Sequence, residues 1–217
     1  MKIKYPRTFH LPWSPGATDD DKIHNLVTIN KMFSGQEVVI TEKLDGENTT
    51  IYANGDSHAR SLDSKHHESR SWVKRKAAEI ASSLPDGWRI VGENLYAKHS
   101  IGYTSLPDFF VMFGIVDENN IAQSWTDVGT WGELLDVQVA PVIYRGTWNE
   151  KLVRELYPFP SRYGSPVAEG YVVRVAGSFK MNEFSNHVAK FVRTNHVTTS
   201  EHWMSQTIIT NGLSDKS

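Results

Sequence analysis

The chain has 217 residues, enough to bury a hydrophobic core as one large domain or two small ones. Its hydrophobic content of 39% and charged content of 22% are ordinary for a globular protein, and its net charge of −2 excludes binding of nucleic acid through a global positive field. The absence of cysteine excludes disulfides, thiolate zinc sites and cysteine nucleophiles.

The first half of the chain combines a turn-rich segment at 11–22 with two strand-like runs and one helix. Residues 36–41 and 48–53 are predicted to pair as a hairpin, because Asp45-Gly46 between two β-prone runs is a strong hairpin signal. Residues 68–84 predict an amphipathic helix, which the Pro-Asp-Gly sequence that follows would end.

The second half is dominated by short strands. We expect them at residues 88–92, 109–116, 138–144, 168–176 and 188–193. Short helices are expected at 127–136 and 149–157, the second with Asn149 as its N-cap. Because strands cluster with few helices between them, the pattern predicts an α+β fold with mostly antiparallel sheets. Since no run of about 18 apolar residues and no signal-peptide core occurs, we expect a cytoplasmic protein that does not enter a membrane.

The chemically informative residue is Lys43, in Lys43-Leu44-Asp45-Gly46. Alone, it is either a solvated strand residue or a covalent nucleophile. Further motifs follow in order along the chain: "HARS" (58–61), "GENLY" (92–96), "DFFVMFGIVD" (108–117), "AEGYVVRV" (168–175) and "AKFVR" (189–193). Each alone also has an ordinary explanation, such as core packing for Phe113 or turn chemistry for Glu169. The ordered set is the informative signal.

This set resembles the covalent nucleotidyltransferase superfamily of ATP-dependent RNA and DNA ligases and mRNA capping enzymes, and within it the phage-type RNA ligases. The resemblance runs from about residue 36 to 193. It implies the nucleotidyltransferase (ligase adenylation domain) fold, in which mostly antiparallel sheets with flanking helices surround a nucleotide cleft. We expect one such domain over residues 1–217, because the tail after "AKFVR" is too short for a C-terminal oligonucleotide-fold domain.

The resemblance also implies roles for individual residues. Lys43 matches the nucleophile, with Asp45 and Lys190 as further catalytic residues. Glu169 and Asn48 are the candidate ligands of Mg²⁺ or Mn²⁺. Glu93 matches the ribose-binding glutamate and Phe113 the adenine-stacking aromatic. The full set of expected nucleotide-binding residues is Glu42, Lys43, Asn48, Arg60, Glu93, Phe113, Glu169 and Lys190.

The expected chemistry makes physical demands on these residues. The amine of Lys43 must be neutral to attack the α-phosphate of ATP, so a divalent cation with Lys190 and Arg60 is expected to lower its pKa. Asp45 is expected to position the lysine, and Gly46 to supply a positive φ in a tight turn. AMP would then move from Lys43 to the 5′-phosphate of an RNA, which a 3′-hydroxyl attacks.

One motif departs from the family pattern. The last motif of the family usually carries two lysines separated by one residue, and the second of these positions is Val192 in this chain. Arg193 is the adjacent cation, but a planar guanidinium differs in geometry from an ammonium.

The predicted function is therefore an ATP-dependent RNA ligase that acts on RNA ends, with a monomer favoured and a compact form similar to viral ligases. The alternatives are another covalent nucleotidyltransferase (DNA ligase or capping guanylyltransferase) and a non-catalytic nucleic-acid-binding domain of the same fold. Three other segments favour plainer explanations: "KHHES" (65–69) a solvated loop, "KRK" (74–76) an exposed helix face, and "SEHWM" (200–204) packing.

Overall fold

In the computed structural model, which describes residues 2–62, 67–194 and 207–214, runs of β-prone residues build two sheets. The five-stranded sheet consists of β1 (Phe9–His10), β11 (Val188–Val192), β9 (Gly170–Val175), β2 (Glu37–Lys43) and β8 (Val142–Thr147), in that spatial order. The six-stranded sheet consists of β10 (Phe179–Lys180), β7 (Ile121–Ala122), β6 (Phe110–Val116), β5 (Arg89–Asn94), β3 (Glu47–Tyr52) and β4 (Ser57–Ala59). Named strand pairs are antiparallel except β1 with β11.

Side-chain caps fix the starts of three helices. The helices are α1 (Leu26–Phe33), α2 (Ser71–Ile80), α3 (Trp125–Leu134) and α4 (Glu150–Glu155), with 3₁₀ turns at Glu68–Arg70, Ala81–Ser83 and Met181–Asn186. Asn25, Ser124 and Asn149 each accept a hydrogen bond from the backbone N–H three residues on. The prediction that Asn149 caps a helix is therefore confirmed.

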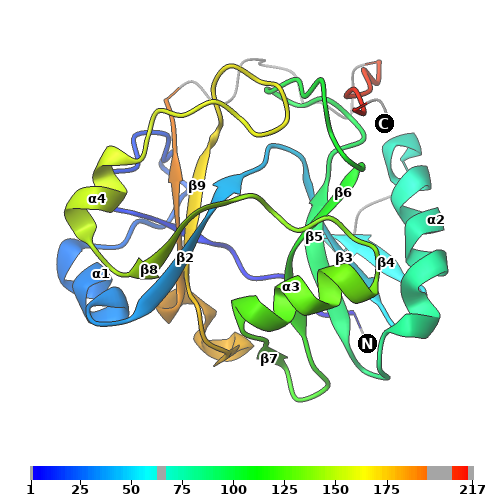
Figure 1. Cartoon of the computed structure of the whole chain (residues 1–217), viewed down its shortest axis with the longest axis horizontal. Coiled ribbons are helices and arrows are strands. Elements are labelled where there is room, and N and C mark those ends of the chain that lie inside the picture. The colour runs from blue at the N-terminus through cyan, green and yellow to red at the C-terminus, as the bar shows by residue number, and fades with distance from the viewer. Residues whose placement is uncertain (1, 63–66, 195–206, 215–217) are drawn as a thin grey trace.

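The helices cover the outer sides of the two sheets. Figure 1 shows α1 and α4 beside the five-stranded sheet, α2 beside the six-stranded sheet, and α3 near β6. Two hydrophobic clusters follow this division. One contains Phe33, Ile40 and Tyr171, and the other contains Ile51 and Phe110. The predicted α+β class with mostly antiparallel sheets is confirmed.

The predicted hairpin is wrong. β2 pairs with β8 and β9, whereas β3 pairs with β4 and β5, so residues 44–46 carry the chain from one sheet to the other. Gly46 does not have the positive φ that we expected. It is needed for close packing instead, because a Cβ there would lie 2.5 Å from the carbonyl oxygen of Asn94.

Two other segments differ from prediction. The run expected as one strand at 138–144 is divided: residues 138–140 bond to Met112 of β6, and β8 begins only at Val142. Helix α1 and the short strands β1, β4, β7 and β10 were not predicted. Of "KHHES", residues 65 and 66 lie outside the described residues, as does all of "SEHWM"; Lys74 and Arg75 are exposed on α2, as expected.

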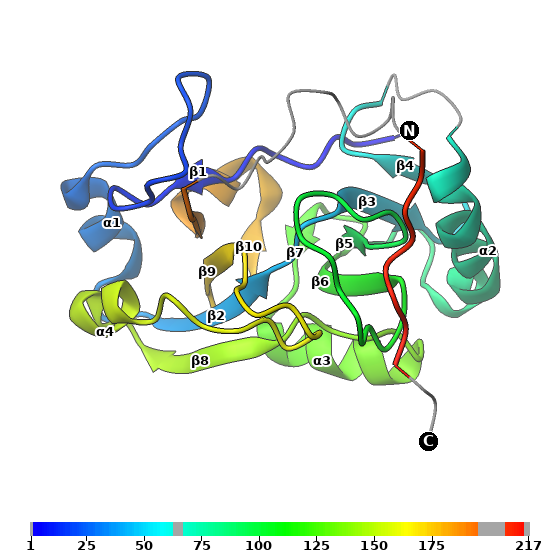
Figure 2. The ribbon, with the colours of Figure 1, turned by 90° about the horizontal axis from the view of Figure 1, so that it is seen from above.

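The N-terminal segment connects the two sheets. The backbone N–H of Ile3 donates to the hydroxyl of Tyr52 at 2.7 Å, and β1 then joins the edge of the five-stranded sheet. Figure 2 shows this dark-blue segment running from the side of β4 to β1. The red segment of residues 207–214 lies against the loop after β5, where the N–H of Lys98 donates to the carbonyl of Ile209 at 2.7 Å.

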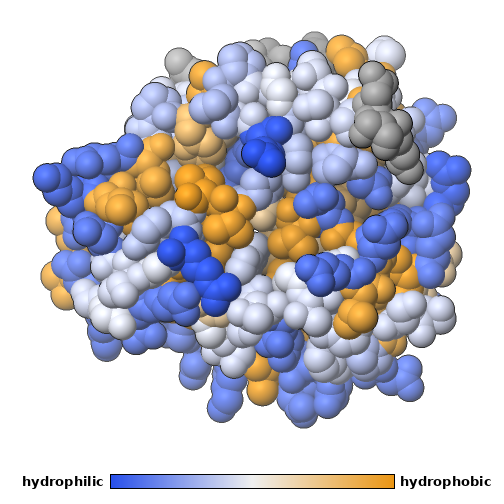
Figure 3. Space-filling model, viewed as in Figure 1, coloured by the Kyte–Doolittle hydropathy of each residue, from blue (hydrophilic) through white to orange (hydrophobic). Residues whose placement is uncertain are grey.

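The face that carries β8 and α3 is mixed in polarity. Figure 3 shows hydrophilic side chains around its rim and apolar ones in patches nearer its middle. Within the described ranges, every helix is too short or too polar to cross a bilayer.

Candidate active site

A cavity of about 530 Å³ lies between the two sheets. The five-stranded sheet contributes Lys43 and Lys190 to its lining, and the six-stranded sheet contributes Asn48, Glu93 and Phe113. Glu42 and Arg60 also line it. The fold thus gathers seven of the nine predicted site residues around one space; Glu169 and Asp45 adjoin it through contacts with the same groups.

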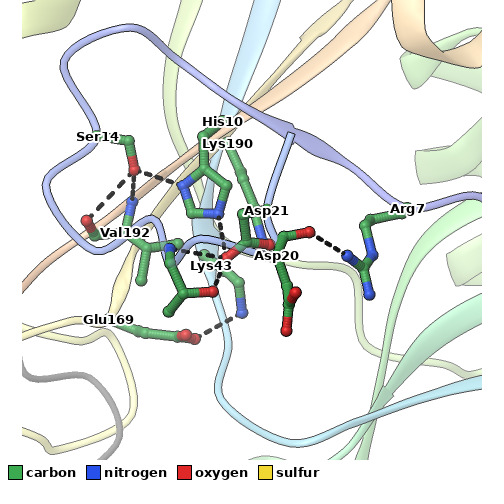
Figure 4. A network of polar contacts seen from close by, with 10 residues as sticks. Arg7, His10, Ser14, Asp20, Asp21, Lys43, Glu169, Lys190 and Val192 are labelled. Atoms are coloured by element: carbon green, nitrogen blue, oxygen red, sulfur yellow. Dashed lines mark hydrogen bonds and ion pairs between the residues drawn. The ribbon is translucent and has the colours of Figure 1, made fainter. Parts of the chain in front are cut away.

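Lys43 and Glu169 meet because their strands are paired. Lys43 ends β2 and lies opposite Gly170, the first residue of β9, and Glu169 is the residue just before that partner. The Nζ of Lys43 donates to Oε2 of Glu169 at 2.6 Å, as Figure 4 shows. The Glu169 side chain is only 5% exposed, whereas that of Lys43 is 23% exposed. The nucleophile candidate is thus held by a buried carboxylate and still reached by solvent.

The protein's own charges keep Lys43 protonated. Burial lowers the pKa of the Lys43 ammonium, but the carboxylates of Glu169, Glu93 and Asp45 outweigh it and raise that pKa above its ordinary value. We expected a lowered pKa. Because the surrounding carboxylates act in the opposite direction, lowering it requires positive charge that the protein alone does not supply.

Asp45 acts mainly on the backbone around it. Its Oδ2 accepts a hydrogen bond from the N–H of Ile101 at 2.7 Å, and its own N–H donates to the hydroxyl of Tyr103 at 2.8 Å. It therefore ties the segment between the sheets to the loop after β5. No hydrogen bond from Lys43 to this carboxylate is seen among the described contacts, so its influence on the lysine is electrostatic.

Glu93 faces the same crossing segment. Its Oε1 accepts a hydrogen bond from the N–H of Gly46 at 3.1 Å. Burial raises the pKa of Glu93 to about 8; the charge of Lys43 opposes this shift and that of Glu169 adds to it. Near neutral pH this carboxyl can therefore both donate and accept hydrogen bonds, and either is compatible with a hydroxyl group as partner.

Two further cations, Lys190 and Arg60, line the same cavity as Lys43. Lys190 is opposite Val172 in the β11–β9 pair, and burial together with the charge of Lys43 lowers the pKa of its ammonium. Arg60 follows β4 and is exposed, with its N–H bonded to the carbonyl of Asn48. Arg60 is close enough to influence the charge of Lys190. Both are placed to meet an anionic group at the cavity.

Glu169 and Asn48, the candidate metal ligands, offer oxygen donors. The Oδ1 of Asn48 is buried and has no hydrogen-bond partner, so an acceptor is left for a ligand. In the described part of the chain, no group of three or more His, Asp or Glu side chains could hold a metal ion. Glu169 and Asn48 therefore fit a Mg²⁺ or Mn²⁺ ion that takes most of its ligands from water and nucleotide phosphates.

The carboxylate of Glu42 is hydrogen-bonded to the loop before β9. Its Oε2 accepts a hydrogen bond from the N–H of Arg162 at 3.0 Å, while its Oε1 is buried without a partner. The residue lines the cavity, yet its carboxylate is engaged by the loop before β9. A role for Glu42 in nucleotide binding stays a prediction.

Neither Val192, at the second lysine position of the last motif, nor the adjacent Arg193 lines the cavity that holds Lys190. Val192 is 1% exposed, and Arg193 lies on a second cavity of about 1000 Å³ that Lys98 and Phe191 also line. Lys190 and Phe191 thus line different cavities, as alternation along a strand dictates. Arg193 does not line the cavity that holds Lys190, and its Nε is buried without a hydrogen-bond partner.

Sequence reasoning missed the N-terminal contribution. Tyr5 lines the main cavity, with its ring 5.7 Å from that of Phe113 and 5.1 Å from that of Phe184, both edge to face. Arg174 is 7% exposed on β9 and stacks near Trp125. Nothing in the first ten residues forms a recognisable motif, so only the folded chain reveals Tyr5; Arg174 was visible in "EGYVVR" but had no assigned role.

Comparisons with known proteins identify the family and the fold of this chain. The RNA ligase family model matches residues 36–192. Three solved structures of Naegleria gruberi RNA ligase are similar in fold. A mutant without ligand has a TM-score of 0.59, 16% identity, and coverage of 78% of this chain and 52% of that one. The form with PPi has a TM-score of 0.59 and 16% identity, and the match covers 89% of this chain and 60% of that one. A mutant with ATP and Mn has a TM-score of 0.58 and 17% identity, and the match covers 78% of this chain and 53% of that one. The chain thus spans about half the length of the solved ligase. No curated protein is a detectable sequence relative.

Proposed function

Because this chain belongs to the RNA ligase family, we propose that it is an ATP-dependent RNA ligase that joins 5′-phosphate and 3′-hydroxyl RNA ends through AMP bound covalently to Lys43. The observation that carries the proposal is the convergence of Lys43, Glu169, Glu93 and Lys190 at one cavity between two sheets. Structures of the Naegleria ligase with ATP and Mn, and with PPi, support the choice of cosubstrate.

The proposed first step uses the amine of Lys43. Its nitrogen attacks the α-phosphorus of ATP, an N–P bond forms, the bond to pyrophosphate breaks, and the nitrogen loses one proton to solvent. Lys190 and Arg60 stabilise the negative charge on the phosphates, and Phe113 stacks on the adenine. Mg²⁺ or Mn²⁺ bound by Glu169 and Asn48 would supply positive charge beside the phosphates.

The later steps transfer AMP to RNA. The 5′-phosphate oxygen of an RNA displaces Lys43 from AMP, which returns the lysine to its amine form. A 3′-hydroxyl then attacks the activated 5′-phosphate and releases AMP. One chain supplies all of these side chains, so the proposal includes a single adenylation domain that acts as a monomer, in the cytoplasm where ATP and RNA are both present.

The test is adduct formation without RNA. The protein is incubated with labelled ATP and Mg²⁺, denatured, and analysed by gel and intact mass. We expect label on the protein and a mass gain of about 329 Da, one AMP joined by loss of water, as the covalent mechanism requires. Lys43→Ala should abolish it, and Lys151→Ala, an exposed lysine on α4, should not.

The substrate classes are separated by two further arms. Adduct formation that is faster with GTP than with ATP would favour a capping guanylyltransferase, and sealing of nicked DNA in preference to RNA would favour a DNA ligase. Binding of RNA that weakens steeply with salt, without any adduct, would identify a non-catalytic domain and refute the proposal.

A further inference from the structure

The segment from β1 to Asp21 wraps around the strand that carries Lys190. His10 lies opposite Lys190 in the parallel pair of β1 and β11, and the N–H of Leu11 donates to the carbonyl of Lys190 at 2.8 Å. Further on, the N–H of Gly16 donates to the carbonyl of Val192 at 2.9 Å. A Cβ on Gly16 would lie 2.2 Å from the carbonyl oxygen of Arg193, so the contact depends on glycine.

A buried polar chain continues from this strand to Asp21. The N–H of Val192 donates to the Oγ of Ser14 at 2.9 Å, and Oγ lies 2.7 Å from Nδ1 of His10. The Nε2 of His10 lies 3.4 Å from Oδ2 of Asp21. Figure 4 shows these contacts in sequence. His10 is 1% exposed, so the ring is fixed between the serine and the carboxylate.

The same order of groups occurs in serine hydrolases, but this serine is placed differently. Ser14 is 7% exposed, and its oxygen already accepts the N–H of Val192. No substrate carbonyl can reach that oxygen without opening the contact with β11. The chain of contacts therefore serves to hold Asp21.

Asp21 is also held from its own loop. Its Oδ2 accepts hydrogen bonds from the N–H and the hydroxyl of Thr18, at 3.2 and 3.0 Å. Its other oxygen, Oδ1, lies 3.8 Å from Nζ of Lys190. One oxygen thus accepts two hydrogen bonds from Thr18 and lies 3.4 Å from Nε2 of His10, while the other lies 3.8 Å from the lysine nitrogen.

This arrangement gives each lysine its own carboxylate. Lys43 contacts Glu169 at 2.6 Å, and Lys190 contacts Asp21 at 3.8 Å. Without a negative charge at position 21, Glu169 would be the remaining carboxylate near both ammonium groups, and Lys190 would be drawn toward it. That movement would take positive charge away from the phosphate side of the cavity.

We propose that Asp21 is a positioning residue that holds the Lys190 ammonium in place for the nucleotide phosphates, so that the N-terminal segment is part of the machinery for lysine adenylylation. The inference rests on the proposed function. It names a residue outside the stretch that the RNA ligase family model matches.

The first test compares neighbouring aspartates. Asp21→Asn keeps the shape of the side chain and removes its charge, and Asp20→Asn makes the same change at an exposed neighbour. Single-turnover rate constants for adduct formation are measured with saturating ATP. We expect Asp21→Asn to lower the rate constant at least tenfold, Asp20→Asn to remain within twofold of wild type, and Asp21→Glu to recover part of the loss. A rate constant of Asp21→Asn within twofold of Asp20→Asn would overturn the proposal.

Misfolding is separated from mispositioning by the form of the defect. Loss of folded protein lowers the amplitude of the adduct but leaves the rate constant of the remaining molecules unchanged. As a milder variant, Thr18→Val removes one hydrogen bond to Asp21 at an exposed position and should slow the reaction about threefold, in keeping with a single lost hydrogen bond. An unchanged rate for Thr18→Val together with a normal rate for folded Asp21→Asn would show that the contacts of Thr18, Asp21 and Lys190 are only structural.

The second test asks whether Asp21 acts through Lys190. The dissociation constant of α,β-methylene ATP with Mg²⁺, which cannot transfer AMP, is measured for wild type, Asp21→Asn, Lys190→Ala and the double variant. We expect Asp21→Asn to weaken binding about threefold or more in the wild-type background and not at all beside Lys190→Ala, a non-additive result. Equal effects in both backgrounds would refute the inference. Failure of wild type to form any adduct would instead refute the proposed function.

Discussion

Both negative and positive side chains surround Lys43, and the negative ones together outweigh burial and raise its pKa. Three carboxylates, those of Glu169, Glu93 and Asp45, favour its protonated form, and Lys190 is close enough for the charge of Lys43 to lower the pKa of its ammonium. A lysine held this way is stable and unreactive until phosphates and positive charge arrive together. In the proposed mechanism, activation of Lys43 is therefore coupled to arrival of the charged substrate.

Glu93 provides a test of this charge balance that does not require catalysis. Its pKa is about 8 in the folded protein and 4.5 ordinarily, so the folded state binds its proton more tightly than the unfolded state. The resulting stability is present below pH 4.5 and is lost as the pH rises to about 8. Glu93→Gln keeps an acceptor for the N–H of Gly46 and cannot ionise. We expect it to be more stable than wild type at pH 8, by on the order of 2 kcal/mol.

Thermal unfolding across pH checks this expectation. For a chain of this size, about 2 kcal/mol corresponds to a rise in Tm of roughly 6 °C. The difference between Glu93→Gln and wild type should be small at pH 5 and grow steadily toward pH 8. Glu79→Gln, an exposed position on α2, controls for loss of a carboxylate. A Tm difference that does not change with pH would contradict the raised pKa.

At the scale of elements, the decisive feature is the crossing at residues 44–46. It leads from Lys43, at the end of β2, to Gly46, whose N–H donates to Glu93 of the other sheet. Gly46 permits this approach, since a Cβ there would lie 2.5 Å from the carbonyl oxygen of Asn94 and 2.8 Å from Cδ2 of Leu95. The sheets can approach each other this closely beside Lys43 because Gly46 has no side chain.

Gly46→Ala should therefore separate β3 from β5 near the site. We expect the variant to lose at least 1–3 kcal/mol of stability from overpacking, with adduct formation reduced more than tenfold in the folded fraction. Gly129→Ala, in α3 with no atom within 4 Å of the added Cβ, should be slightly stabilising and fully active. Chemical denaturation and single-turnover adduct formation check both. Normal activity of Gly46→Ala would show that the close approach is not required.

The same crossing shows where local sequence signals end. Asp-Gly correctly marked a break between β2 and β3, but which sheet each strand joins depends on partners more than 35 residues away, such as Arg89–Asn94 and Gly170–Val175. Helix α1 has local sequence signals, namely Asn25 as N-cap, the apolar residues Ile29 and Phe33, and Gly35 after its end. The motif residues were found because their chemistry is local to a few positions.

At the scale of the whole molecule, the site is assembled from parts far apart in sequence. Tyr5, Asp21 and Lys190 come from the two ends of the described chain and meet at one cavity or its edge. Contacts of this kind leave no periodic pattern in the sequence, because each depends on where the segment docks. This explains why the motif residues between Lys43 and Lys190 were predictable and the contributions of Tyr5 and Asp21 were not.

A ligand that touches both sheets should stabilise the whole fold. At about 100 times its dissociation constant, α,β-methylene ATP with Mg²⁺ should add about 2.7 kcal/mol and raise the Tm by roughly 5–10 °C. Phe113→Ala removes the proposed stacking surface in the cavity and should lose at least half of that rise at the same ligand concentration. Phe159→Ala, an aromatic beside Tyr157 and outside the cavity lining, should lower the starting Tm but keep the full rise. An undiminished shift in Phe113→Ala would mean that the base does not bind against this ring, and the nucleotide would have to be placed elsewhere between the sheets.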